Sequence, residues 1–377
     1  MLSCGEPSGD LYAAALTRDV MARAPGTEVF GFGGDGFAAA GGELLGHFAG
    51  LSVTGLTEAL RVVPRSLAMI RRLVAAARDR RPDVFVAVDF PDFNFRLMAG
   101  IRALGIPVVY YISPQLWAWR SGRMATMQRL VDRVLVIFPF EERIYREAGV
   151  PVTFVGHPIV DMARPGGTRA GIRAGLGLDP DRPLVALLPG SRTNELRLIA
   201  PDMAAALPAI AARVPGVQFV VARAPHLGDG LFAPFTSGTI RPLLVQQRTD
   251  DLLASADLAL VASGTATVQA ALHECPMVVV YRLSPWTYRL GHRFVKVDTY
   301  AMANLVAGSR VVPELIQDGF DAGRLADEAA DLLTNRTRRD AMVDALRGVR
   351  GKLGVPGASG RAADAVIEVA RRHAASC

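Results

Sequence analysis

The chain has 377 residues; half of them are hydrophobic and 21% are charged. This composition excludes a disordered or low-complexity protein, and no apolar run reaches the ~18 residues that a membrane-spanning helix needs. The net charge of +6 suits anionic partners such as phosphates or anionic lipid, but no zinc-finger, RNP or basic-zipper pattern supports nucleic acid as a partner.

Short β-branched runs alternate with longer amphipathic stretches. The predicted strands are 29–31, 84–88, 108–112, 134–138, 152–155, 184–188, 217–222, 258–262 and 277–281. The predicted helices include 11–23, 65–80, 195–214 and 266–273, and the chain is helical again from about residue 321. This alternation predicts an α/β fold with parallel sheets covered by helices on both faces.

The strand pattern restarts once, after a stretch rich in Gly, Arg, Asp and Pro at 156–183. At about 150 residues per domain the length also suggests two domains. We therefore predict an N-terminal domain over 1–160, a C-terminal domain over 161–350, and a C-terminal helix within 351–377 that can pack back on the N-terminal domain.

A short first strand is predicted within the first four residues, and the first candidate loop follows it. Its small and acidic residues at the mouth of a helix fit a sugar or its phosphate, and the alternative is a helix cap by Ser8 or Asp10. The candidate ligand-binding residues of this loop are Gly5, Glu6, Ser8, Gly9 and Asp10.

Residues 61–81 hold seven arginines and one acid, with apolar residues interleaved. A basic amphipathic helix can lie on an anionic membrane surface, although such a helix more often packs one face on a sheet. The residues predicted for the membrane surface are Arg65, Met69, Arg72 and Leu73.

Asp89 directly follows the predicted strand 84–88, at the carboxyl end where α/β active sites open. A carboxylate there can take a proton from an attacking hydroxyl, and the alternative is a structural partner for an arginine. A later segment, 111–120, holds two of the three tryptophans. Trp119 and Arg120 are candidates for the wall of an acceptor site or for a core-filling cluster.

Two strand–turn–helix segments in the second half have the chemistry of a diphosphate site. Gly190, Ser191 and Arg192 follow the strand 184–188, and Ser263, Gly264 and Thr265 follow the strand 258–262. Helix N-termini offer free N–H groups and arginine can clamp a diphosphate, while an ordinary capped turn is the alternative. Both turns lie at carboxyl ends of strands, which favours one crevice for a nucleotide diphosphate.

Cysteine and histidine spacing indicates neither disulfides nor metal. The three cysteines lie far apart and the six histidines are scattered, which predicts a reducing, cytoplasmic setting and no metal site.

The ordered set of these motifs resembles the lipid-A-disaccharide synthase family. The matching segments include 5–10, 82–94, 111–120, 138–141, 155–158, 187–192, 262–266, 275–279, 281–282 and 304–305. The resemblance implies two Rossmann-like doubly wound domains facing each other across a cleft, the GT-B architecture.

That resemblance also implies an inverting, metal-independent transfer between two lipid-linked sugars. The donor would be UDP-2,3-diacylglucosamine and the acceptor 2,3-diacylglucosamine 1-phosphate. The products would be lipid A disaccharide 1-phosphate and UDP, made by a peripheral protein on the cytoplasmic face of the inner membrane. No cofactor is implied, and the oligomeric state stays open.

Roles follow by position from the resemblance. Asp89 would be the general base, and the two turns after 184–188 and 258–262 would hold the UDP-sugar. Asn304 would also belong to the UDP-sugar site, together with Gln269, where the family usually has Glu. Two alternatives remain: another UDP-sugar GT-B enzyme, such as a hexosaminyltransferase or a UDP-N-acetylglucosamine 2-epimerase, and a non-catalytic relative at the membrane surface.

Overall fold

The computed structural model describes residues 1–50, 56–114, 121–283 and 299–375. It divides the chain into two compact units. Unit 1 contains residues 1–158 together with 353–377, and unit 2 contains residues 159–352.

The sheet of unit 1 contains seven strands in the order β3-β2-β1-β4-β5-β6-β7, and the strand pairs are parallel. Their bounds are β1 Leu2–Cys4, β2 Phe30–Gly33, β3 Glu43–His47, β4 Phe85–Val88, β5 Val108–Tyr111, β6 Arg133–Val136 and β7 Val152–Phe154. Buried apolar residues fill β1, β2, β4 and β5 because helices cover both faces of the sheet.

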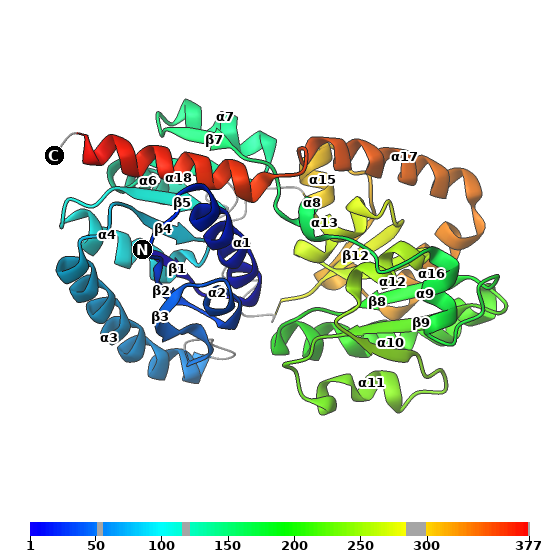
Figure 1. Cartoon of the computed structure of the whole chain (residues 1–377). Helices are drawn as coiled ribbons and strands as arrows, with labels where there is room; N and C mark the ends of the chain where they lie inside the picture. The colour runs from blue at the N-terminus through cyan, green and yellow to red at the C-terminus, as the bar shows by residue number, and fades with distance from the viewer. Residues whose placement is uncertain (51–55, 115–120, 284–298, 376–377) are drawn as a thin grey trace. The chain divides into compact units, whose positions relative to one another are not determined.

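The main core of unit 1 lies between the sheet and one layer of helices (Figure 1). Leu73 of α3, Leu97 of α4 and Met127 of α6 pack there against Phe85 and Tyr110 of the sheet. The helices of the unit are α1 Pro7–Arg23, α2 Asp35–Ala39, α3 Leu56–Arg80, α4 Pro91–Arg102, α6 Met124–Leu130, α7 Pro139–Glu147 and α18 Ala358–Ala374.

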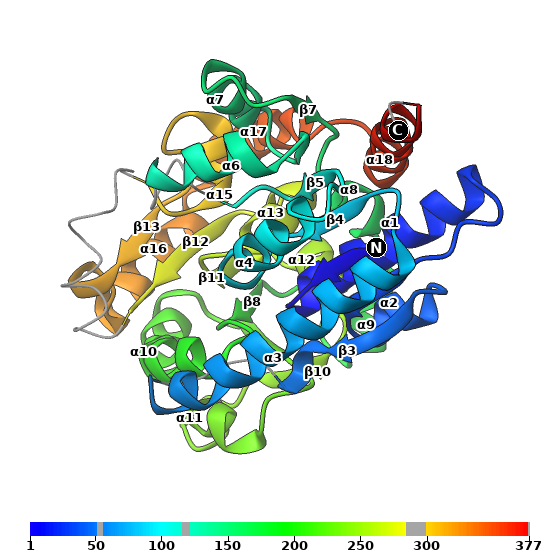
Figure 2. The same ribbon diagram turned by 90° about the vertical axis from the view of Figure 1, so that its left-hand side faces the viewer.

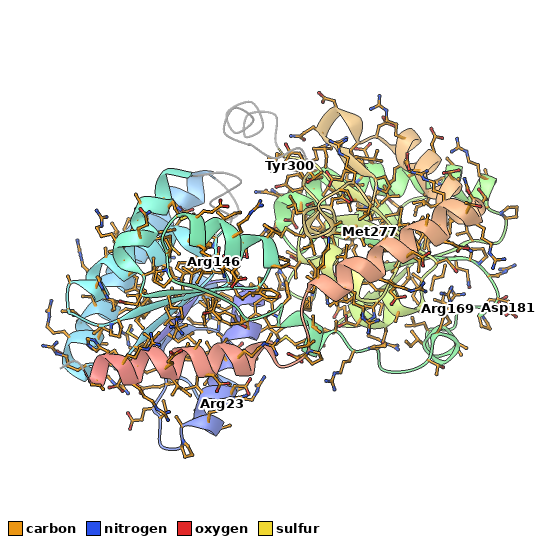
Figure 3. All side chains as sticks on the ribbon, turned by 90° about the horizontal axis from the view of Figure 1, so that it is seen from above. Arg23, Arg146, Arg169, Asp181, Met277 and Tyr300 are labelled. Carbon is orange, nitrogen blue, oxygen red and sulfur yellow. The ribbon has the colours of Figure 1, made fainter. Side chains whose placement is uncertain are left out.

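The last helix, α18, packs against the first, α1. Small buried residues on both, including Ala13 and Ala362, let the helices approach closely. Arg23 at the end of α1 pairs with Asp364 of α18 at 3.0 Å, and Figure 3 marks its position beside that helix. The C-terminal helix therefore belongs to the structure of unit 1.

The sheet of unit 2 contains six strands in the order β10-β9-β8-β11-β12-β13, again with parallel pairs. Their bounds are β8 Leu184–Leu188, β9 Gln218–Arg223, β10 Leu243–Gln246, β11 Leu258–Ala262, β12 Met277–Tyr281 and β13 Glu314–Ile316. The helices are α8 Ile159–Met162, α9 Arg169–Gly175, α10 Thr193–Arg213, α11 Ala233–Thr236, α12 Thr249–Ser255, α13 Thr265–Leu272, α15 Met302–Ala307, α16 Ala322–Thr334 and α17 Arg336–Lys352.

The two parallel α/β sheets confirm the predicted fold class. The strands β3, β10 and β13 were not predicted; each lies at an edge of its sheet. Their side chains are exposed or half-buried, so they lack the continuous apolar run that marks a central strand. The predicted helix 65–80 also begins earlier, at Leu56, and continues through Pro64.

Candidate functional site

Each sheet reverses its strand order at one point. The reversal lies between β1 and β4 in unit 1, and between β8 and β11 in unit 2. In open α/β sheets ligands bind beyond the carboxyl ends of the strands at such a reversal. The segments that follow these four strands contain residues 5–10, 89–94, 189–192 and 263–265, so each unit has its own group of candidate site residues.

The loop after β1 packs tightly against the loop after β4. A Cβ built on Gly5 would lie 2.1 Å from the ring of Phe90, and one built on Gly9 would lie 3.5 Å from Cys4. Both glycines are buried, and their lack of a side chain allows this close packing. A ligand could therefore contact only their backbone. The side chains of Glu6 and Ser8 are half-buried at the start of α1.

Asp10 was predicted as an acceptor-binding residue, and that prediction is wrong. The side chain is buried, and its carboxylate accepts hydrogen bonds from the backbone N–H groups of Gly34 (2.8 Å), Gly36 (2.8 Å) and Phe37 (3.1 Å). These N–H groups start α2, where a carboxylate satisfies donors that lack a helical partner. Asp10 therefore fastens α1 to α2.

Asp89 lies one residue beyond β4, beside the reversal point. Its backbone is left-handed, with φ of 46°, and Phe90 follows with φ of 50°. The side chain is half-buried. Burial, and after it the negative charge of Asp89, raises the pKa of the Tyr12 and Tyr110 phenols. The Asp89 carboxylate is therefore close to the mouth of α1 and to the end of β5, where a substrate hydroxyl could meet it.

His157 lies just beyond β7, and its side chain is buried. Burial lowers the pKa of its imidazole to about 3. The ring packs edge-on against Tyr12, with centroids 6.1 Å apart, and against Phe138, with centroids 5.2 Å apart. Trp119 and Arg120, the other acceptor candidates of unit 1, lie outside the described residues.

In unit 2, the turn after β8 leads into the long helix α10. Gly190 has φ of 118°, a conformation that favours glycine, and Ser191 and Arg192 are exposed. The carboxylate of Glu195 accepts hydrogen bonds from the N–H groups of Ser191 (3.1 Å) and Arg192 (3.2 Å), and its other oxygen accepts one from the Arg192 guanidinium (3.1 Å). A carboxylate thus already lies where the helix start and the arginine would hold a phosphate.

Sequence reasoning gave no role to Glu195 or to His226. The Nε2 atom of His226, which follows β9, is 2.9 Å from the Ser191 carbonyl oxygen; the carbonyl can only accept, so Nε2 carries the proton. The position of Glu195 at the start of the predicted helix 195–214 was a readable signal, because a carboxylate is favourable at a helix N-terminus. The sequence carries no comparable signal for His226, which reaches the turn from a neighbouring strand.

The turn after β11 contains Gly264, which has φ of 154°. A Cβ built on Gly264 would have no atom of the described residues within 4 Å. Ser263 Oγ donates to the Tyr300 carbonyl (2.9 Å), and Thr265 is exposed at the start of α13. The open space above Gly264 leaves room for a phosphate to approach the first N–H groups of α13.

Asn304 was predicted to contact the UDP-sugar, but its side chain is buried and fully used within the fold. Its Nδ2 donates to the Val312 carbonyl (3.0 Å) and to Glu314 (2.7 Å), and its Oδ1 accepts from the N–H groups of Val311 (2.8 Å) and Val312 (2.9 Å). An asparagine amide has no further capacity for direct binding. The prediction that the Asn304 side chain contacts the UDP-sugar directly is therefore wrong.

Glu314 links Asn304 indirectly to the turn after β11. Its carboxylate accepts from the backbone N–H groups of Tyr300 and Ala301, both at 2.9 Å, and the Tyr300 carbonyl accepts from Ser263. Asn304 thus supports the segment that holds Ser263.

Gln269 lies in α13, half-buried, with its Nε2 3.4 Å from Asp250. The same carboxylate oxygen lies 2.8 Å from Nε2 of His273. No observation tests the predicted contact of Gln269 with the nucleotide.

The basic helix α3 runs along the outer side of unit 1 (Figure 2). Arg65 and Arg72 are exposed, Met69 is half-buried against the core, and Leu73 is completely buried in the core. The prediction that Leu73 lies on the membrane surface is therefore wrong, because Leu73 is on the face of α3 that packs on the sheet. Among the residues of this helix whose side chains are described, Val63 and Leu67 are the large apolar residues that are exposed.

Within the described ranges, no three His, Cys, Asp or Glu side chains are grouped so that they could hold a metal ion. A search of the same ranges finds no helix with the length and apolar character of a membrane span.

Comparison with known proteins shows the family to which this chain belongs. Residues 1–357 match the family model described as lipid-A-disaccharide synthetase. A lipid-A-disaccharide synthase of Myxococcus xanthus is 45% identical over 370 residues, covering 98% of this chain and 97% of the relative. That of Geobacter sulfurreducens is 40% identical over 373 residues, covering 98% and 96%.

Solved structures show the same fold at low identity. The UDP-GlcNAc 2-epimerase of Neisseria meningitidis, solved bound to UDP-GlcNAc, has a TM-score of 0.71 at 12% identity, covering 97% of this chain and 99% of that one. A glycotransferase of kitacinnamycin has a TM-score of 0.64 at 20% identity, covering 98% of each chain. These likenesses concern the fold alone, and they agree with the predicted pair of Rossmann-like domains.

Proposed function

The chain belongs to the lipid-A-disaccharide synthetase family, and from that premise we propose how its residues carry out the transfer. The protein is a glycosyltransferase of lipid A biosynthesis. It joins UDP-2,3-diacylglucosamine to 2,3-diacylglucosamine 1-phosphate and releases UDP. The observation that carries the mechanism is the position of Asp89, one residue past β4 at the reversal point of the unit 1 sheet.

Asp89 acts as the general base. As the 6-hydroxyl oxygen of the acceptor attacks C1 of the donor sugar, its proton passes to the Asp89 carboxylate. The bond from C1 to the β-phosphate oxygen breaks, and its electron pair leaves with UDP. Attack from the side opposite to the leaving group inverts the configuration at C1, and a positioned carboxylate of this kind contributes about 10²- to 10⁴-fold to the rate.

The diphosphate of the donor binds in unit 2. Arg192 and the N–H groups at the starts of α10 and α13 neutralise the charge that develops on the leaving UDP. The absence of a side chain at Gly264 allows the backbone of its turn to approach a phosphate, whereas the space beside Gly190 is filled by the Glu195 side chain. We assign this charge neutralisation to the protein's own donors, with no metal ion required. Turnover that persists in excess chelator would support this assignment, and turnover restored only by a divalent cation would refute it.

The membrane face of the protein is proposed to be the exposed side of α3. Arg65, Arg71 and Arg72 are exposed together with Val63 and Leu67, which suits an anionic, partly apolar surface. Reversing Arg65, Arg71 and Arg72 to Glu should release the protein from vesicles that contain anionic lipid. A matched reversal of three arginines of α17 (Arg336, Arg339 and Arg350) should not, and equal release by both sets would show that only net charge matters.

The direct test is an assay with both lipid substrates. The purified protein is incubated with UDP-2,3-diacylglucosamine and 2,3-diacylglucosamine 1-phosphate, and UDP release and the disaccharide mass are followed. Formation of the disaccharide is the expected outcome. UDP binding without disaccharide would indicate another donor or acceptor, and a folded protein that neither binds UDP nor forms product would favour a non-catalytic relative.

A further inference from the structure

The backbone at Asp89 is in an unfavourable conformation. Asp89 and Phe90 are consecutive residues with positive φ, 46° and 50°. Aspartate tolerates the left-handed region, but a bulky side chain such as phenylalanine is a clear outlier there. Such a conformation persists only where the surrounding structure imposes it.

Buried side chains from two neighbouring elements hold the Asp89 carbonyl. Asn94 Nδ2 of α4 donates to this oxygen at 2.7 Å, and the Tyr110 hydroxyl of β5 donates to it at 2.8 Å. Asn94 and Tyr110 are both completely buried. The N–H of Asp89 in turn donates to the Tyr111 carbonyl at 3.1 Å. The peptide groups on both sides of Asp89 are therefore fixed.

A third element, strand β1, orients the Asn94 side chain. Ser3 of β1, also completely buried, donates from Oγ to Asn94 Oδ1 at 2.7 Å. This bond fixes which end of the Asn94 amide faces the Asp89 carbonyl. The ring of Phe90 completes the arrangement, because it lies against Gly5 and, with centroids 5.4 Å apart, against Phe93.

We infer that Tyr110 and Asn94 are positioning residues for the transfer, which hold Asp89 in its left-handed conformation and so fix the direction of its carboxylate. The inference rests on the proposed role of Asp89 as the base. Rotation of the backbone to an ordinary conformation would swing the Cα–Cβ bond and move the carboxylate away from the acceptor hydroxyl. Small displacements of a catalytic group can cost up to about 10²-fold in rate.

The variant Tyr110→Phe tests the inference with minimal change of shape. It should lower kcat about tenfold, leave the KM of both substrates within about twofold, and leave UDP affinity unchanged. Asn94→Ala should lower kcat further, because it removes the donor and leaves the Ser3 hydroxyl without its acceptor. Circular dichroism and thermal unfolding check that each variant is folded.

The matched control is Tyr145→Phe. Tyr145 is likewise completely buried in unit 1, and its hydroxyl is 2.7 Å from Ser113 Oγ rather than near Asp89. The control removes a hydroxyl that is bonded to Ser113 and Pro114, so it should lower the unfolding temperature about as much as Tyr110→Phe and leave kcat unchanged. A fall in kcat that is equal in the two variants would overturn the inference, as would an unchanged kcat in Tyr110→Phe.

A double variant separates positioning from a general structural effect. In the Asp89→Ala background, Tyr110→Phe should cause no further loss of the residual single-turnover rate, because its effect passes through the absent carboxylate. A further tenfold loss there would also overturn the inference. Failure of the proposed function would appear differently: the unaltered protein would bind UDP and form no disaccharide.

Discussion

The two sheets share one topology, yet their reversal points present opposite chemistry. In unit 1 the reversal carries a carboxylate, Asp89, on a left-handed backbone held by buried side chains. In unit 2 the reversal carries glycine turns, helix starts and the guanidinium of Arg192. One sheet architecture thus yields a proton acceptor or an anion site, according to the few residues that follow its central strands.

Asp89→Ala should have the largest effect in this comparison. We expect kcat to fall about 10³-fold, because the acceptor hydroxyl loses its base, while UDP affinity changes less than twofold because the nucleotide binds in unit 2. Product formation by mass and UDP binding by calorimetry measure the two parts. Turnover close to that of the unaltered protein would remove Asp89 as the base.

Arg192→Ala should affect the other unit. The loss of a charge-assisted contact to the diphosphate should weaken UDP binding about 10- to 100-fold. The control is Arg213→Ala, which removes an exposed arginine from the last turn of the same helix, where it pairs with Asp327. Equal UDP affinity in both variants would refute the proposed contact between Arg192 and the diphosphate.

Acid should weaken unit 1 through His157. Because burial lowers its pKa to about 3, the folded protein keeps His157 neutral while the unfolded chain, with a pKa near 6.5, takes up a proton. Stability therefore falls as the pH drops through 6.5 toward 3, by about 2 kcal/mol between pH 7 and pH 5. His157→Gln should show a smaller difference in unfolding temperature between these two pH values. An undiminished difference would assign the acid sensitivity to other groups.

Glu195→Gln should have the smallest effect. Whether it strengthens or weakens UDP binding distinguishes two roles of Glu195. Its carboxylate repels a diphosphate and occupies the N–H groups of Ser191 and Arg192. The neutral amide should therefore bind UDP a few-fold more tightly, while the unfolding temperature falls slightly because a helix start loses an anion. Weaker UDP binding would mean that Glu195 mainly shapes the turn for the ligand.

The central strands and the fold class were predictable because parallel strands covered on both faces appear as short, unbroken apolar runs. Their carboxyl ends then indicated the turns at 189–192 and 263–265, and the position of Asp89. Three edge strands, β3, β10 and β13, were missed because their side chains are exposed or half-buried, whereas the fourth edge strand, β7, was predicted. Leu73 was misplaced because the two arginines directly before it, Arg71 and Arg72, obscured which face of α3 packs on the sheet.

Three-dimensional partners decided the remaining residues. Asp10 and Asn304 have side chains suited to ligands, but backbone N–H groups of other segments use their oxygens: those of Gly34 and Gly36 for Asp10, and those of Val311 and Val312 for Asn304. Likewise, Tyr110 and Asn94 look like an ordinary strand tyrosine and a helix residue until the Asp89 carbonyl is placed between them. Sequence patterns give the types of residues at a crevice, whereas hydrogen-bond partners determine which of them remain available.

The return of α18 to unit 1 sets an order of events during synthesis. Unit 2 is one continuous stretch, 159–352, whereas unit 1 needs residues from both sides of it. A ribosome therefore finishes unit 2 before it makes the helix that packs against α1. A chain that stops short of residue 353 would carry a complete second half beside an N-terminal half with an uncovered apolar helix, the kind of surface that chaperones and proteases recognise.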